Sequence, residues 1–141
     1  MQELTHYLNG AHVKGTSGRF ADVYNPATGE VQAKVPLANE SEMDQAVKYA
    51  MAAQPAWAAV NPQRRARVMM KFVDLLNRDM DKLAEALSRE HGKTLPDAAG
   101  DVQRGLEVVE YCIGAPELLK GDFTDSAGPG IDMYSMRQPL G

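Results

Sequence analysis

The feature that most constrains the fold is an apolar repeat between residues 69 and 87. Large apolar residues recur there three or four positions apart, and charged residues follow the same rhythm on the opposite side. The apolar set consists of Met69, Phe72, Leu76, Met80, Leu83 and Leu87. A helix of this kind gains most of its stability by packing its apolar face against another element. The repeat therefore predicts a layer of packed helices.

The ends of this helix, and the start of the next one, carry capping signals. Asn61-Pro62 is expected to begin it, because asparagine caps free N–H groups and proline at the first turn has no N–H to lose. Gly92 is expected to end it as a left-handed cap. Thr94 with Asp97 then caps a further helix, whose own apolar stripe is Ala98, Val102, Leu106, Val109 and Ile113.

A shorter helix is predicted before these two. Ser41 and Asp44 fit a capping box, with a hydroxyl at the cap and a carboxylate three residues later. Its stripe of mostly small apolar residues is Met43, Ala46, Val47, Ala50 and Ala53. We expect the helix to end before Pro55, because proline inside a helix removes a hydrogen bond. One additional helical turn is expected at residues 117–119.

The residues before the helices predict β-hairpins. Asn9-Gly10 favours a two-residue turn in which both residues have positive φ. That turn pairs Leu8 with Ala11, Tyr7 with His12, and His6 with Val13. The two histidines then lie on opposite faces, because side chains alternate along a strand, and a two-histidine metal site is not expected there. Residues 23–31 are expected to form a second strand, turn and strand.

A change of period after Gly121 predicts a C-terminal β-hairpin. Its strands are expected at residues 122–126 and 131–136, with Pro139 ending the second strand. The fold class predicted for this segment is α+β, with N-terminal β-hairpins, three main helices and a C-terminal β-hairpin.

Charge and cysteine content exclude several classes of partner and site. The chain has 141 residues and a net charge of -4, and its basic residues do not cluster, so we expect no nucleic-acid or membrane partner. The single cysteine, Cys112, cannot form an internal disulfide and is expected to pack late in a helix rather than act as a nucleophile. The acidic start at residues 1–4 indicates a cytoplasmic protein. Gly92-Lys93-Thr94 is not read as a phosphate loop, because a helix precedes it.

Short motifs spread along the chain resemble one family. They include Leu8-Asn9-Gly10, Asn25-Pro26-Ala27-Thr28-Gly29-Glu30, Arg64-Arg65, Glu90 and Gly92-Lys93. In this order they resemble the N-terminal part of aldehyde dehydrogenases. Within that family, the sequence is most similar to the coenzyme A-acylating methylmalonate-semialdehyde dehydrogenases.

The resemblance implies a parent enzyme with the α/β aldehyde dehydrogenase fold. Residues 1–121 would be the N-terminal strands and helical layer of its NAD-binding domain, and residues 122–138 would be strands of its oligomerisation arm. The parent would use NAD and coenzyme A to convert the semialdehyde to propionyl- or acetyl-coenzyme A with release of CO2, and would form a homotetramer. The catalytic domain, with its cysteine and glutamate, is absent from these 141 residues, so the segment alone is expected to be inactive and to bind no cofactor.

Arg104 is the one residue to which the resemblance assigns a role, that of holding the substrate carboxylate. A guanidinium suits this role because it can bind both carboxylate oxygens at once. Arg104 is also predicted to lie opposite the apolar stripe of its helix, beside Val108 and Tyr111. The alternative is a solvent-facing arginine paired with Glu107, one turn further on.

The sequence leaves alternatives open for the chain as a whole. The parent could be a coenzyme A-independent NAD(P) aldehyde dehydrogenase instead, because the acyl-transfer region lies outside these residues. The chain could also act as a non-catalytic module that associates with intact subunits, or be a separately studied domain without a role of its own.

Overall fold

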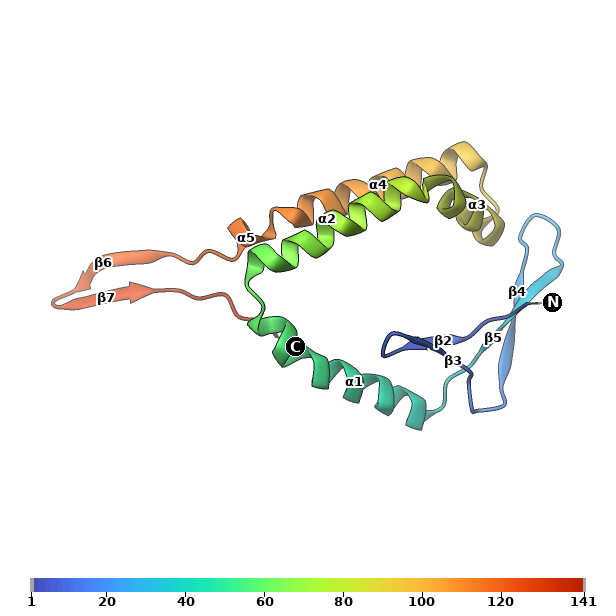
Figure 1. The fold of residues 1–141 in the computed structure, drawn as a ribbon, viewed down its shortest axis with the longest axis horizontal. Helices are drawn as coiled ribbons and strands as arrows, with labels where there is room; N and C mark the ends of the chain where they lie inside the picture. Colours follow the sequence, from blue (N-terminus) through green and yellow to red (C-terminus); the bar gives the residue numbers. More distant parts are fainter. Residues whose placement is uncertain (1, 141) are drawn as a thin grey trace.

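The helices and strands of this computed structural model, which describes residues 2–140, follow one another around an open ring (Figure 1). One side of the ring is α1 (Glu40–Ala59). The opposite side consists of α2 (Pro62–Arg78), α3 (Met80–His91) and α4 (Leu95–Ile113), with α2 and α4 side by side. A small sheet joins the two sides, and a C-terminal hairpin projects away from the ring.

The joining sheet has the strand order β1-β5-β4. The short β1 (Gln2–Glu3) runs parallel to β5 (Val31–Pro36), and β4 (Phe20–Tyr24) runs antiparallel to it. The strand, turn and strand predicted at residues 23–31 are therefore confirmed, with longer strands on both sides. The turn fits because Gly29 has a φ of 75°, a conformation that glycine adopts without steric cost.

The first hairpin has the predicted register. Strands β2 (His6–Leu8) and β3 (Ala11–Val13) pair His6 with Val13, Tyr7 with His12, and Leu8 with Ala11. Asn9 and Gly10 both have positive φ, at 50° and 78°, as the two-residue turn requires.

The start and end of α1 differ from the prediction. The cap is Asn39, not Ser41: its side-chain oxygen accepts from the Glu42 N–H, and the Glu42 carboxylate accepts from the Asn39 N–H, each over 2.9 Å. A capping box thus forms two residues earlier than expected, because Asn39 has the extended backbone that a cap needs. The end predicted before Pro55 is also wrong. Pro55 removes one hydrogen bond of the helix and brings its ring close to the carbonyl of Met51, yet the helix continues through it to Ala59.

The long helix predicted from Asn61 to Gly92 is divided into two. Asp79 leaves helical geometry, with φ −106° and ψ 16°, and separates α2 from α3. Its carboxylate pairs with Arg78 and Lys82, and hydrogen bonds from these cations lower the pKa of Asp79 to about 2. The apolar spacing continues across the break, which is why the sequence pattern does not reveal it.

The remaining capping predictions are confirmed. Gly92 ends α3 with a φ of 82°, and the Thr94 side chain accepts from the Asp97 N–H at the start of α4. After Ile113 the chain makes one further turn, α5 (Ala115–Leu118), close to the turn predicted at residues 117–119.

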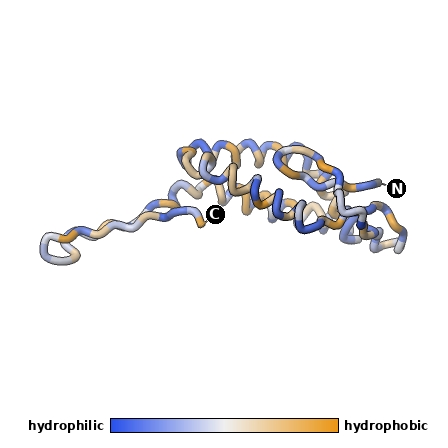
Figure 2. The backbone as a smooth tube through the Cα atoms, turned by 90° about the horizontal axis from the view of Figure 1, so that it is seen from below, coloured by the Kyte–Doolittle hydropathy of each residue, from blue (hydrophilic) through white to orange (hydrophobic). Residues whose placement is uncertain are grey.

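Small residues form the centre of the helical side. Ala66 of α2, Ala84 of α3 and Ala98 of α4 are buried, so the helix backbones approach closely. The predicted stripe of α4 faces this contact, with Ala98 0% and Leu106 3% exposed. Each helix carries hydrophobic and hydrophilic residues in alternating groups along its length (Figure 2).

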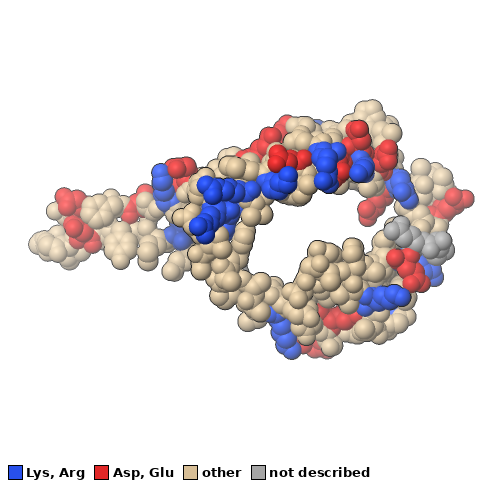
Figure 3. All heavy atoms as spheres, viewed as in Figure 1, with Lys and Arg blue, Asp and Glu red and all other residues tan. Residues whose placement is uncertain are grey.

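Much apolar surface is left uncovered. The chain exposes 10846 Å², whereas a compact monomer of its mass would expose about 7,200 Å². The excess of about 3,700 Å² reflects the opening of the ring, which persists when all atoms are drawn (Figure 3), and the projecting hairpin. Large side chains such as Met43, Val47 and Phe72 are exposed among the described residues.

The ring closes where the sheet meets the end of α3. The Gln32 side-chain amide of β5 donates to the Arg89 carbonyl over 3.1 Å. A Cβ at Gly92 would lie 2.8 Å from the Pro26 ring, so the glycine lets the β4–β5 turn approach the helix end. We call these two contacts the ring seam.

The C-terminal hairpin is confirmed with shifted ends. Strand β6 (Phe123–Gly128) pairs with β7 (Ile131–Tyr134) across a turn at residues 129–130, with an irregularity between Thr124 and Gly128. The second strand ends at Tyr134, before Pro139, so the role predicted for that proline is wrong. The next rung is only half a ladder rung: the Ser135 N–H donates to the Asp122 carbonyl over 2.9 Å, but the Asp122 N–H donates to the Ser135 hydroxyl over 2.8 Å instead of to its carbonyl.

Candidate substrate-binding site

The turn between α3 and α4 fixes the start of the helix that carries Arg104. Gly92 reverses the chain in a left-handed conformation, and Thr94 caps α4 immediately afterwards. Lys93 lies between these two residues, and the Ser88 hydroxyl donates to its carbonyl over 2.7 Å. The direction of α4, and with it the position of Arg104, therefore follows from a well-defined turn.

Arg104 lies on the exposed side of α4, as predicted from its helical position. Its side chain is 79% exposed. Val108, one turn further on, is 62% exposed, and Tyr111 follows on the same side. The guanidinium thus has an exposed apolar strip beside it on the helix.

Arg104 belongs to a three-residue ion cluster, which we call the Asp101 cluster. The Arg104 Nη1 donates to Asp101 Oδ1 over 3.0 Å. The other carboxylate oxygen, Oδ2, accepts from the Lys93 ammonium. Asp101 therefore bridges the turn before α4 and the first two turns of that helix.

The alternative interpretation, a solvent-facing Arg104 paired with Glu107, names the wrong acid, because Arg104 pairs with Asp101. The Glu107 carboxylate instead accepts from the Gln103 side chain over 3.3 Å. Helical side chains lean towards the helix N-terminus, so an arginine reaches an acid three residues before it more readily than one three residues after it. This direction was available from the sequence and would have identified Asp101.

The charges of the Asp101 cluster favour an ionised carboxylate. The hydrogen bond from Lys93 is the largest cause of the lowered pKa of Asp101, and the electrostatic attraction of Lys93 and Arg104 acts in the same direction. Two permanent cations share one anion, so the cluster keeps a net positive charge.

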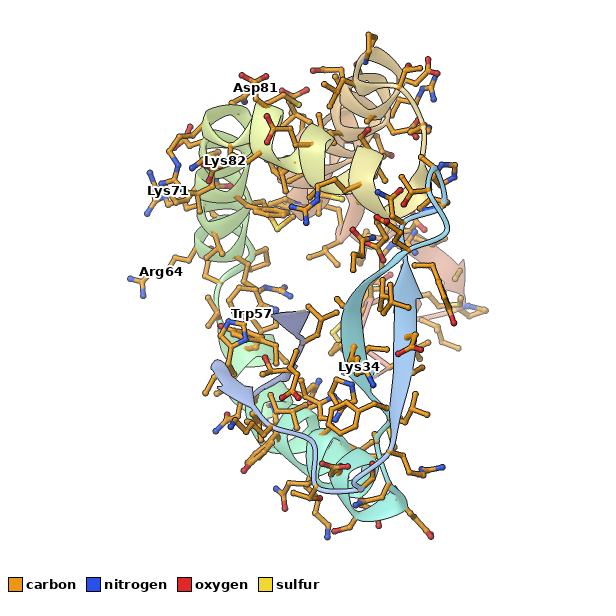
Figure 4. The ribbon with its side chains drawn as sticks, turned by 90° about the vertical axis from the view of Figure 1, so that its right-hand side faces the viewer. Lys34, Trp57, Arg64, Lys71, Asp81 and Lys82 are labelled. Atoms are coloured by element: carbon orange, nitrogen blue, oxygen red, sulfur yellow. The ribbon has the colours of Figure 1, made fainter. Side chains whose placement is uncertain are left out.

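Three basic side chains of α2 and α3 do not take part in the Asp101 cluster. In Figure 4, Arg64 and Lys71 of α2 extend away from the helices, and Lys82 lies near Asp81 at the start of α3. Lys71 pairs with Asp74 over 3.6 Å on the same helix. These residues form an ordinary solvated face.

Cys112 lies in an apolar hollow at the far end of α4. The hollow measures about 200 Å³, and Trp57, Ala66 and Met69 also line it. Cys112 is partly exposed rather than fully buried. It thus contributes to packing between α1, α2 and α4, as expected, although less completely than a core residue.

Within residues 2–140, no group of three or more His, Cys, Asp or Glu side chains is arranged to hold a metal ion. In the same residues, no helix combines the length and apolar character needed to cross a membrane.

The fold and the family comparison together define the class of protein. Residues 12–141 match the aldehyde dehydrogenase family, and the chain belongs to that family. The α+β arrangement described above is an N-terminal piece of the aldehyde dehydrogenase fold, as predicted.

Among curated relatives, the chain is similar to semialdehyde dehydrogenases. It is 47% identical over its whole length to the malonate-semialdehyde dehydrogenase of Pseudomonas aeruginosa, of which it covers 28%. It is 46% identical over 138 residues, 98% of the chain, to the acylating mitochondrial methylmalonate-semialdehyde dehydrogenase of Arabidopsis thaliana, of which it covers 23%. The chain thus spans less than a third of the length of these relatives.

Solved structures give the same picture. A protein of Sinorhizobium meliloti 1021 assigned as a methylmalonate-semialdehyde dehydrogenase, solved with NAD, is 63% identical with a TM-score of 0.96; the comparison covers all of this chain and 29% of that one. The methylmalonate-semialdehyde dehydrogenase of Oceanimonas doudoroffii is 44% identical with a TM-score of 0.94, over 99% of this chain and 28% of that one.

Proposed function

We propose that this chain is the N-terminal segment of an NAD-dependent, coenzyme A-acylating methylmalonate- or malonate-semialdehyde dehydrogenase. The names of the relatives and the NAD complex of the Sinorhizobium meliloti protein support the proposal. Residues 1–121 would then belong to the NAD-binding domain and residues 122–138 to an oligomerisation arm. The parent would be a cytoplasmic homotetramer.

In the proposed reaction, a semialdehyde carrying a carboxylate is oxidised and its acyl group passes to coenzyme A with release of CO2. NAD would accept the hydride, and the catalytic cysteine and glutamate would come from the remainder of the enzyme. The contribution of this chain is to bind and orient the substrate carboxylate through Arg104.

The observation that carries this assignment is the state of the Arg104 guanidinium. Within residues 2–140 its hydrogen bonding engages Nη1 alone, and the side chain is largely exposed. The Nε and Nη2 edge is therefore available for a carboxylate, which that edge binds with two parallel hydrogen bonds.

One alternative use of the chain has a specific observation in its favour. The uncovered apolar surface would also suit a non-catalytic module that binds intact subunits. A coenzyme A-independent aldehyde dehydrogenase is the second alternative. The Asp101 cluster would bind the substrate carboxylate in either enzyme, so it does not distinguish coenzyme A from water as the acyl acceptor.

The test is Arg104→Leu in the full-length enzyme that contains this chain. Loss of a charge-assisted contact worth about 1.5 to 3 kcal/mol should lower kcat/KM for malonate semialdehyde roughly tenfold to a hundredfold. The kcat/KM for propanal, which has no carboxylate, should not change. Arg104→Lys should restore only part of the loss, because it keeps the charge without the two-pronged geometry.

The ratio of kcat/KM for the two aldehydes is the deciding quantity. A solvent-facing arginine predicts small and equal changes for both. An unchanged ratio in Arg104→Leu would remove the substrate-binding role, and turnover without coenzyme A would favour the second alternative.

A further inference from the structure

We propose that Asp101 is a positioning residue that holds Arg104 in place for the substrate carboxylate. The inference rests on the proposed function and adds a residue to it. It starts from the way in which one carboxylate divides its two oxygens between two cations.

Exposure increases outward through the Asp101 cluster. The side chains of Lys93, Asp101 and Arg104 are 21%, 36% and 79% exposed. Lys93 lies in the turn between Gly92 and Thr94, so the least exposed member is attached to the chain outside α4. Asp101 contacts both Lys93 and Arg104, and it thereby restricts a guanidinium that would otherwise move freely at the end of a long side chain.

Lys93 also prevents Asp101 from neutralising the arginine. An isolated Asp101–Arg104 pair would carry no net charge, and its carboxylate would compete with the substrate carboxylate. In the Asp101 cluster one oxygen is engaged by Lys93 and the other by a single nitrogen of Arg104. The guanidinium is therefore positioned while the cluster keeps a net positive charge.

A purely structural role for Asp101 makes a different prediction. The Lys93–Asp101 pair joins the α3–α4 turn to α4, and its loss could simply loosen the helices. Loosened helices would impair the use of every substrate and lower the thermal midpoint. A positioning role affects only substrates that carry a carboxylate, and only when Arg104 is present to be positioned.

The experiment uses Asp101→Ala in the full-length enzyme, with Glu107→Ala as the matched control. Glu107 is the other nearby acid on the exposed side of α4 and does not contact Arg104. In Asp101→Ala the KM for malonate semialdehyde should rise roughly five- to tenfold, because binding must then order a free arginine side chain. The kcat for that substrate and both constants for propanal should not change, and Glu107→Ala should leave all of these values unaltered.

Combination with Arg104→Leu completes the test. If Asp101 acts through Arg104, the double variant Asp101→Ala/Arg104→Leu should have the same ratio of kcat/KM for the two aldehydes as Arg104→Leu alone. A KM that falls or stays constant in Asp101→Ala overturns the inference, as does an equal loss for both aldehydes. If Arg104→Leu leaves the ratio unchanged, the substrate-binding role of Arg104 fails, and the inference fails with it.

Discussion

Leu106 should be the single most costly side chain to truncate in this chain. It is 3% exposed at the contact of α4 with α2 and α3, whereas Val108, two residues along the same helix, is 62% exposed. The pair forms a matched test of whether the predicted apolar stripe stabilises the fold.

The expected size follows from the surroundings of the side chain. Leucine-to-alanine changes at buried sites cost about 2 to 5 kcal/mol, more where the cavity cannot collapse. Leu106 borders a groove of about 370 Å³ that Phe72 and Leu83 also line, so its neighbours have room to relax. We therefore expect about 2 to 3 kcal/mol for Leu106→Ala. Val108→Ala should change stability by less than about 0.5 kcal/mol, because alanine's higher helix propensity offsets the small loss of contact.

Urea unfolding followed by circular dichroism measures both variants. With a typical slope of about 1 to 3 kcal/mol per molar, Leu106→Ala should lower the midpoint by about 1 M or more, and Val108→Ala should leave it nearly unchanged. Equal shifts in the two variants would refute the packing argument. So would the lack of a cooperative transition in the unmodified chain.

The remaining predictions concern the isolated chain. It should form dimers or larger species in sedimentation velocity, since about 3,700 Å² of excess surface exceeds one side of a typical interface; a compact monomer at high micromolar concentration would contradict this. It should not reduce NAD with malonate semialdehyde and coenzyme A, and turnover that survives Cys112→Ser would show otherwise. It should lose stability as the pH falls from about 4 towards 2. The folded pKa of Asp79 lies below its usual value, so the Arg78 and Lys82 pairs stabilise the fold above this window and are lost within it. The midpoint of Asp79→Asn should depend less on pH across that range.

Local patterns were predicted well because short-range physics decides them. The Asn9-Gly10 turn needs only two positive φ angles, and its strand register then follows residue by residue. Gly92 and Thr94 likewise act on their own backbone neighbours. The stripe of α4 was visible because a buried helix face imposes its period on the sequence.

The errors arose where several local solutions compete. Asn39 and Ser41 can both cap a helix. Asn39 has the extended backbone of a cap, whereas Ser41 already lies inside α1. The apolar period passes through Asp79 unchanged, so the sequence pattern does not show the break that the backbone angles of Asp79 make.

The candidate site was predicted only in part. Helical geometry placed Arg104 on the exposed side correctly, but spacing alone cannot choose between acids three residues before and after it. The direction in which helical side chains lean makes that choice and selects Asp101. The Lys93 contact joins residues eight positions apart across the Gly92–Thr94 turn, a separation that the three- and four-residue spacing of a helix does not reveal.

The ring seam has a mechanical consequence. It joins residues 57 positions apart in sequence, yet most of the intervening chain belongs to rigid helices. Residues 37–39 before α1 are held to residues 16–19 by several hydrogen bonds, among them that from the Leu37 N–H to the Arg19 carbonyl over 2.9 Å. The shape of the ring is therefore governed mainly by one short joint, at Val60-Asn61 between α1 and α2. One hydrogen bond contributes only about 1 kcal/mol, so the seam opposes rotation at this joint weakly. A body that fills the ring would act by fixing one angle rather than by reshaping the helices.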